Sequence, residues 1–177
     1  SLEMASRNAA DAQAMVDTAD GAYQEVSNML LRMREMAVQA ANGTLSDADR
    51  TALNTEMTAL ENEITKIAGN TEFAGIDLGT SKAVTFQIGA GNNETLEHTF
   101  KNFDAASLNL TSSVATATQA AGTISIVDAA ISLVSTRRGE LGALSNRLSS
   151  TIANLDNIAV NLSSARGRIQ DTDFATE

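Results

Sequence analysis

Residues 15–40 read MVDTADGAYQEVSNMLLRMREMAVQA, and apolar residues recur in this stretch at alternating intervals of four and three. The members of this first series are Met15, Ala19, Ala22, Val26, Met29, Met33, Met36 and Ala40. This heptad spacing is typical of a helix that packs along its length against other helices. A second series follows at Leu53, Met57, Leu60, Ile64 and Ile67. A third occupies the C-terminal part of the chain, at Val127, Ile131, Val134, Leu141, Leu148, Ile152, Leu155, Leu162 and Ile169.

The three series predict helices at about residues 5–41, 46–68 and 124–170. Asn42-Gly43 suits the left-handed position that ends a helix, and Ser46 with Asp49 predicts the start of the next one. Because the first and third helices come from opposite ends of the chain, the predicted fold class is mainly α, an elongated helical bundle or coiled coil. We expect the helix packing to rest on Val26, Met29, Met33, Leu53, Leu60, Ile64, Leu141, Leu148, Ile152, Leu155 and Leu162.

Between the second and third helices the apolar period changes to two. Residues 84–88 (VTFQI) and 96–100 (LEHTF) alternate apolar and polar side chains, and 89–93 (GAGNN) lie between them. This pattern predicts a β-hairpin within about residues 73–103, packed against the helices by its aromatic side chains. Residues 104–119 are rich in Ser, Thr, Asn and Ala, which favours irregular chain or a frayed helix start. Together these elements predict a single domain over residues 1–177.

Composition excludes several classes of function. The 177 residues carry a formal net charge of −10 with only 12 Lys and Arg, which argues against nucleic acid as a partner. No uninterrupted apolar run approaches the roughly 20 residues of a membrane span, so no membrane partner is expected. The first residues, SLEM, resemble no cleavable secretion signal, and both ends suggest a piece of a longer chain.

No pattern predicts an enzyme. His98 is the only histidine and there is no cysteine, so no metal site is expected, and the glycines lack the spacing of a phosphate loop. We therefore predict no catalytic residues and no cofactor. The methionines at series positions favour a core over an adaptable binding surface. The arginines favour the solvated edges of a bundle, and a shared contact site stays open as the alternative: Arg32, Arg34, Arg137, Arg138 and Arg147.

Longer segments resemble a known family. Residues 31–44 (LRMREMAVQAANGT) resemble the N-terminal core of bacterial flagellin. Residues 144–148 (LSNRL), 154–158 (NLDNI) and 161–175 (NLSSARGRIQDTDFA) resemble its C-terminal core. FAGI at 73–76 and FQIGA at 86–90 match its hairpin region. The matches follow the family's order and cover most of the chain.

The resemblance implies a structural subunit of the flagellar filament. It also implies that the part of the subunit present here is the rod-shaped D1 domain of flagellin. It implies other flagellin subunits as partners, an extracellular location and export by the flagellar secretion apparatus without a cleavable signal peptide. The terminal D0 helices and the variable outer domains have no counterpart here, so the fragment is expected to be monomeric in solution. The alternatives are a hook-filament junction protein and a flagellin-like cell-surface adhesin or receptor for polysaccharide.

The family also carries a site for an animal innate immune receptor of the Toll-like class. The matching positions are Arg32, Met36 and Glu56. Leu31 stands where Gln is common in the family, and Met36 where Leu is common. Neither difference removes charge or much volume, so we expect the receptor to bind.

Overall fold

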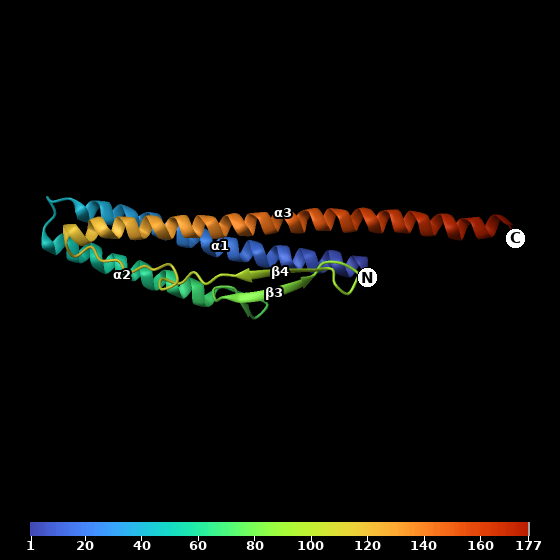
Figure 1. Ribbon diagram of the computed structural model, residues 1–177, viewed down its shortest axis with the longest axis horizontal. Helices are drawn as coiled ribbons and strands as arrows, with labels where there is room; N and C mark the ends of the chain where they lie inside the picture. Colours follow the sequence, from blue (N-terminus) through green and yellow to red (C-terminus); the bar gives the residue numbers. More distant parts are fainter. Residues whose placement is uncertain (177) are drawn as a thin grey trace. The chain divides into compact units, whose positions relative to one another are not determined.

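The computed structural model describes residues 1–176, and the side chains of residues 1–169. In chain order the elements are α1 (Leu2–Ala41), α2 (Asp47–Asn70), β1 (Glu72–Phe73), β2 (Ile76–Asp77), β3 (Lys82–Gln87), β4 (Thr95–Phe100) and α3 (Ala117–Thr176) (Figure 1). The prediction of a mainly α fold, with two N-terminal helices, one long C-terminal helix and a small antiparallel strand pair, is confirmed.

Backbone contacts divide the chain into two compact units. The first comprises residues 1–16, 83–98 and 143–177, and the second comprises residues 17–82 and 99–142. The helices α1 and α3 each contribute a segment to both units. The single domain over residues 1–177 stays a prediction.

In the first unit, the start of α1 packs antiparallel to the later part of α3. Ser6 Oγ donates to Asp156 Oδ1 at 3.1 Å, and Gln13 Nε2 donates to Ser145 Oγ at 2.6 Å, so the numbers rise on one helix as they fall on the other. The buried residues of α1 here are mostly alanines, whose small side chains permit close approach of the helices. Asn8 Nδ2 donates to the backbone oxygen of Gln87 at 3.0 Å and thereby ties α1 to the end of β3.

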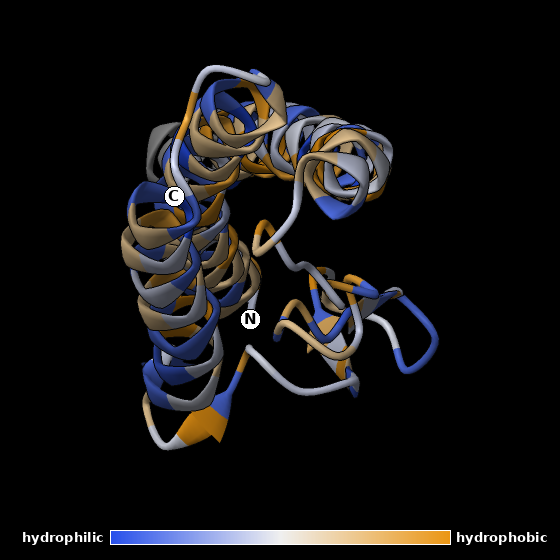
Figure 2. Ribbon diagram, turned by 90° about the vertical axis from the view of Figure 1, so that its left-hand side faces the viewer, coloured by the Kyte–Doolittle hydropathy of each residue, from blue (hydrophilic) through white to orange (hydrophobic). Residues whose placement is uncertain are grey.

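In the second unit, the apolar faces of α1, α2 and α3 supply the core. Its members include Val26, Leu30, Met33, Met57, Ile64, Val127 and Val134, all at most 1% exposed. Burial of one such large side chain stabilises the fold by roughly 1.5–3 kcal/mol. In Figure 2, apolar and polar residues alternate along the helix ribbons, as amphipathic helices require.

The region predicted as one hairpin contains two separate antiparallel strand pairs, β1 with β2 and β3 with β4. In the first pair Glu72 faces Asp77 and Phe73 faces Ile76. The two residues of its turn, Ala74 and Gly75, have φ of 50° and 77°. Positive φ at both central residues is the requirement of the tight hairpin turn whose twist matches that of its strands.

The helix α3 begins at Ala117, seven residues before the predicted start at 124. Thr116 Oγ1 accepts from the backbone N–H of Gln119 at 3.2 Å and also donates to the Gln119 side-chain oxygen at 3.2 Å. This is a helix cap followed three residues later by Gln, a recognised start signal. The segment before Thr116 is irregular, as predicted.

The helix α3 is also long and apolar enough, by length and composition alone, to cross a membrane. The sequence predicted no membrane span, because no uninterrupted apolar run is long enough. Val127, Val134, Leu141 and Leu148 on this helix are buried inside the protein, although only 28% of the apolar window is buried. The core helix of a soluble protein passes the same test, so the feature is weak evidence for a membrane.

The end of α1 is stabilised by Arg50, which the sequence did not single out. Positive φ occurs in the described residues only at Ala74, Gly75 and Asn109, so the left-handed conformation predicted for Asn42-Gly43 is wrong. Instead the Arg50 guanidinium donates to the backbone oxygens of Ala40, Asn42 and Leu45 at 2.6, 3.0 and 2.8 Å. The last turn of α1 holds no basic residue, and Arg50 supplies positive charge at its partly negative end.

We expect Arg50→Met to lower the free energy of unfolding by about 2 kcal/mol, because Arg50 is 7% exposed and its loss leaves partly buried carbonyls without a donor. Arg7→Met on the exposed face of α1 is the matched control, with an expected change within about 0.5 kcal/mol. Denaturant unfolding followed by circular dichroism measures both. Equal losses in the two variants would contradict this role for Arg50.

Candidate functional site

The candidate functional features in the described part of the chain are exposed side chains and shallow hollows on its surface. Among residues 1–169, whose side chains the structure describes, no group of three or more His, Cys, Asp or Glu could hold a metal ion. The histidine His98 is half-buried in β4. Glu61 accepts from the hydroxyl of Ser112, whereas Glu63 pairs with Lys66 at 3.5 Å. These carboxylates therefore make separate structural contacts.

Arg32 and Glu56, two of the three predicted receptor residues, lie together on the surface of the second unit. Arg32 Nη2 and Nε donate to Glu56 Oε1 at 2.9 and 3.1 Å, which links α1 to α2. Arg32 Nη1 lies 3.5 Å from Glu35 on the same helix. The two side chains of the main pair are 50% and 46% exposed. The hydrogen bond to Glu56 raises the pKa of the Arg32 guanidinium, and the same contact holds the side chain against α2.

Met36, the third predicted receptor residue, has no exposed surface. It is one turn after Arg32 on α1 but belongs to the apolar series, and the structure places it in the core. The geometry therefore brings Arg32 and Glu56 together and leaves Met36 beneath them.

Two apolar residues outside the first series, Leu31 and Val38, are each 49% exposed on α1. They are seven residues apart, which places them on the same face of the helix. In the same unit, a shallow hollow between the end of α1 and the start of α2 is lined by Gln39, Leu45, Asp49, Ala52, Leu53 and Glu56. Sequence reasoning missed this surface, although an apolar pair with heptad spacing outside the buried series was a signal.

Two other arginines, Arg34 and Arg138, link helices by ion pairs. Arg34 Nε lies 2.6 Å from Asp128 Oδ1, and Arg138 donates to both oxygens of Asp20 at 2.8 and 3.2 Å. Hydrogen bonds to these carboxylates raise the pKa of Arg34 and of Arg138. Arg137 donates to the backbone oxygen of Asn102. These contacts fit the interpretation of the arginines as edges of a bundle.

The residues predicted to carry the helix packing differ in exposure. Val26, Met33, Ile64 and Leu148 are fully buried, and Leu141 and Leu155 are 2% and 6% exposed. Met29, Leu53, Leu60 and Ile152 are half-buried. Leu162 is 59% exposed, in contrast to the expectation. Its part of α3, in the first unit, lies beside the first residues of α1, where little of that helix is available to cover it.

Tyr23 is a core residue that the heptad series did not contain. Its hydroxyl donates to the backbone oxygen of Lys101 at 2.8 Å, and its ring centroid lies 4.5 Å from that of Phe103. Burial raises the pKa of this hydroxyl. The signal was its place directly after Ala22, since a buried helix face is wider than a strict heptad seam.

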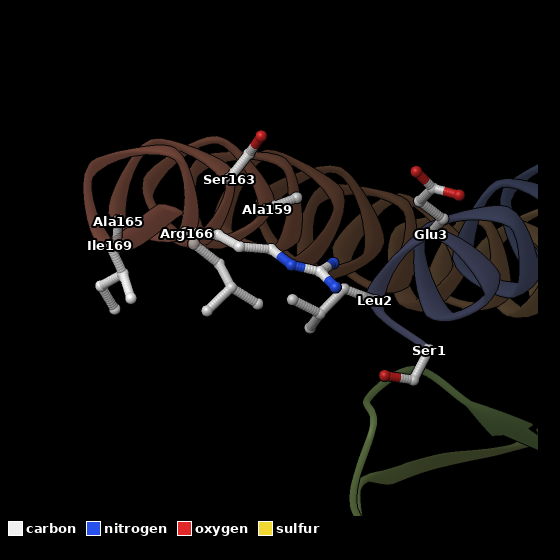
Figure 3. Close-up of a pocket in the computed structure, with 9 residues that line it drawn as sticks. Ser1, Leu2, Glu3, Ala159, Ser163, Ala165, Arg166 and Ile169 are labelled. Atoms are coloured by element: carbon white, nitrogen blue, oxygen red, sulfur yellow. The ribbon is translucent and has the colours of Figure 1, made fainter. Parts of the chain in front are cut away.

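A groove in the first unit lies where α1 begins beside α3. Its lining residues are Ser1, Leu2, Glu3, Ala159, Leu162, Ser163, Ala165, Arg166 and Ile169. Figure 3 shows the Arg166 side chain extending along this groove toward Leu2. Ile169 is 74% exposed, so the groove has an apolar floor open to solvent.

Comparisons with known proteins give a consistent result. Residues 1–79 match the family described as bacterial flagellin N-terminal helical region, and residues 124–177 match bacterial flagellin C-terminal helical region. The chain is 39% identical to a flagellin of Halalkalibacterium halodurans over 99% of its own length and 66% of the relative's, which is just under two thirds. It is 36% identical to a flagellin of Bacillus subtilis over 99% of its own length and 70% of the relative's.

Solved structures show the same fold. The crystal structure of Bacillus cereus flagellin matches with a TM-score of 0.77 and 33% identity, over 90% of this chain and 94% of that one. A putative flagellar hook-associated protein from Vibrio parahaemolyticus matches with a TM-score of 0.78 over 94% of this chain and 90% of that one. Its identity is 15%, so this second match concerns the fold alone.

We expect the Asp20–Arg138 pair to have a coupling free energy of roughly 0.5–1 kcal/mol, since it is partly exposed and makes two hydrogen bonds. A double-mutant cycle of Asp20→Asn and Arg138→Gln measures it by denaturant unfolding. The coupling should fall as salt is added, because salt screens exposed charges. A coupling of zero at low salt would show that the pair contributes nothing to stability.

Proposed function

The chain belongs to the bacterial flagellin family, a family of structural proteins and not of enzymes, and from this premise we propose that it is a structural subunit of the flagellar filament. The observation that carries the proposal is coverage: 99% of the chain aligns with flagellins, at 39% identity in one case. The shared fold with Bacillus cereus flagellin supports it. We further propose an extracellular location in the flagellum and export by the flagellar secretion apparatus without a cleavable signal peptide.

A filament subunit must keep its shape while its surface contacts other copies. The helices here are held by fully buried side chains and by ion pairs between helices, such as Arg34 with Asp128. Leu31 and Val38 then supply exposed apolar surface on a helix whose other face is already buried. We propose that these two residues contact a neighbouring subunit. For the chain of 177 residues alone we propose a monomer, because two separated side chains bury too little surface for a stable interface.

The test is filament formation by the full-length gene product in a flagellated bacterium that lacks its own flagellin. We expect filaments by electron microscopy with the unaltered protein. Leu31→Asp combined with Val38→Asp should abolish or shorten them, since the charges would be buried between subunits. Thr55→Asp, on the exposed surface of α2, is the control and should leave filaments unchanged. Secreted but unassembled unaltered protein would contradict the proposed function.

The pair of Arg32 and Glu56 supports a second proposal, recognition by an animal innate immune receptor of the Toll-like class. The guanidinium is held by Glu56 yet half exposed, so a receptor can approach it without unfolding the helix. Met36, which is buried, would act only by supporting the backbone beneath this pair.

We expect Arg32→Ala to remove most receptor binding while helicity is unchanged, because the side chain is exposed and its ion pairs add little stability. Lys66→Ala, which removes an exposed cation from α2, is the control and should bind normally. Met36→Leu conserves volume and should also bind normally. Surface plasmon resonance with the receptor ectodomain measures all three. A null response of receptor-expressing cells to the unaltered full-length protein would refute this proposal.

The alternative functions have specific tests. A flagellar hook-associated protein shares the fold at 15% identity, so the fold alone does not distinguish a junction protein from a filament subunit. The identity to flagellins favours the filament. A junction protein would be found only where hook and filament meet when labelled on cells. A surface adhesin would bind immobilised polysaccharide in a glycan screen, whereas the acidic charge of the chain disfavours polyanions.

A further inference from the structure

The turn between α1 and α2 contains the single Asn-Gly pair of the sequence, Asn42-Gly43. Both residues are exposed and lie outside the helices. We propose that Asn42 is a site of spontaneous chemical modification, at which deamidation proceeds through a succinimide and yields mainly isoaspartate. This inference is independent of the proposed function.

The first step is attack by the Gly43 backbone nitrogen on the side-chain carbon Cγ of Asn42. The nitrogen loses its proton to solvent base and the new N–Cγ bond forms. The Cγ–Nδ2 bond then breaks as Nδ2 takes a proton from solvent and leaves as ammonia. The residue after Asn must be small and mobile for this ring to close, and Gly has no Cβ to obstruct it. A Cβ on Gly43 would meet nothing within 4 Å, so the local space is open.

The hydrogen bonds of the turn favour this step. In the described part of the chain, the Gly43 N–H makes no hydrogen bond to another group, so its proton is not engaged by the fold and is open to solvent base. The Asn42 side-chain oxygen accepts from the backbone N–H of Thr44 at 3.1 Å. That bond orients the amide within the turn and draws electron density from Cγ, which makes the carbon more electrophilic.

The second step is hydrolysis of the succinimide, and Arg50 favours isoaspartate over aspartate as its product. Water opens the succinimide at either carbonyl: attack at Cγ gives aspartate, whereas attack at the main-chain carbonyl of residue 42 gives isoaspartate. Arg50 Nη1 donates to the main-chain oxygen of Asn42 at 3.0 Å, and the N–H of Leu45 lies 3.3 Å from the same oxygen. A cationic donor polarises the carbonyl that it contacts, so water is directed to this carbon.

The isoaspartate product also places a carboxylate next to the buried guanidinium of Arg50. When the ring opens at the main-chain carbonyl, the bond to the Gly43 nitrogen breaks and this carbonyl becomes a free carboxylate. The new carboxylate forms at the group that already accepts from Arg50. The carboxylate of Asp47 is 3.9 Å from Arg50 Nε, and its side chain is fully exposed. The modification therefore gives the guanidinium a close counter-ion and adds a single negative charge to the turn.

The chain supplies its own comparison site at Asp20-Gly21, which can form the same succinimide. This pair lies inside α1, where backbone amides are engaged in helical hydrogen bonds. The Asp20 carboxylate is also held by Arg138 at 2.8 Å. In the folded protein this site should stay unmodified, and it should form isoaspartate only when the chain is unfolded.

The experiment incubates the 177-residue protein in mildly alkaline buffer, folded or unfolded in guanidinium chloride. Enzymatic methylation of isoaspartate and peptide mass spectrometry that separates isoaspartate from aspartate report each site. In the folded protein we expect modification at residue 42, with an isoaspartate-to-aspartate ratio about fivefold above that of the unfolded chain, the order of effect of one hydrogen bond. Gly43→Ala should slow the reaction.

Arg50→Met should return the ratio to the unfolded value, provided that circular dichroism shows α1 and α2 intact. The comparison of folded with unfolded wild-type protein decides the matter if this variant does not fold. Equal ratios in the two states would overturn the proposed role of Arg50. An unmodified Asn42 in the folded protein, after the unfolded chain has reacted, would overturn the site itself.

Discussion

The structure depends on burial of the apolar face of α1, which extends from Ala5 to Ala40 with members at most 5% exposed. No helix of this composition is stable alone in water with such a face exposed, because most of the stability of a helix comes from packing. In each unit the face is covered by other segments, and in both of them α3 supplies part of the cover. The abundance of alanine toward the start of α1 and of larger residues after Val16 shows that the same face is packed by different side chains in the two units.

The periodicity of the sequence was enough to predict that α1 has a buried apolar face, but it did not predict how wide that face is. Met33, Met36 and Ala40 follow the heptad and are fully buried. Tyr23 and Leu30 lie one residue after members of the series and are buried as well, because the buried face of the helix is wider than a strict heptad seam. The early start of α3 depends on Thr116 and Gln119, which form a helix cap. The surrounding residues are also rich in Ser and Thr, so the sequence did not distinguish this cap from irregular chain.

Other features could not be predicted because they depend on contacts between distant residues. At Gly79 a Cβ would lie 1.6 Å from the backbone oxygen of Ala68, so the chain passes directly against the end of α2. Nothing in the local sequence marks Gly79 as different from the other glycines. In the same way, the pairing of Arg32 with Glu56 needs the packing of α1 on α2, although the resemblance to flagellin named both residues. Met36 belongs to the apolar series, which predicts burial, and also to the predicted receptor residues, which predicts exposure. It has no exposed surface, so the apolar series predicts its position correctly.

Arg32 and Arg50 show that the role of a cation is set by its surroundings and not by its residue type. Arg32 has close carboxylate partners and is half exposed, so water and salt weaken its interactions, and replacing it changes the surface more than the fold. Arg50 is buried among backbone oxygens, and the helix end that it covers lacks another cation. A formal charge of −10 is compatible with both roles because, among residues 1–169, no acidic residue is buried and most are exposed, so solvent and salt weaken the repulsion between them. The surface can therefore change to suit assembly or recognition while the buried Arg50 and the apolar faces keep the helices in place.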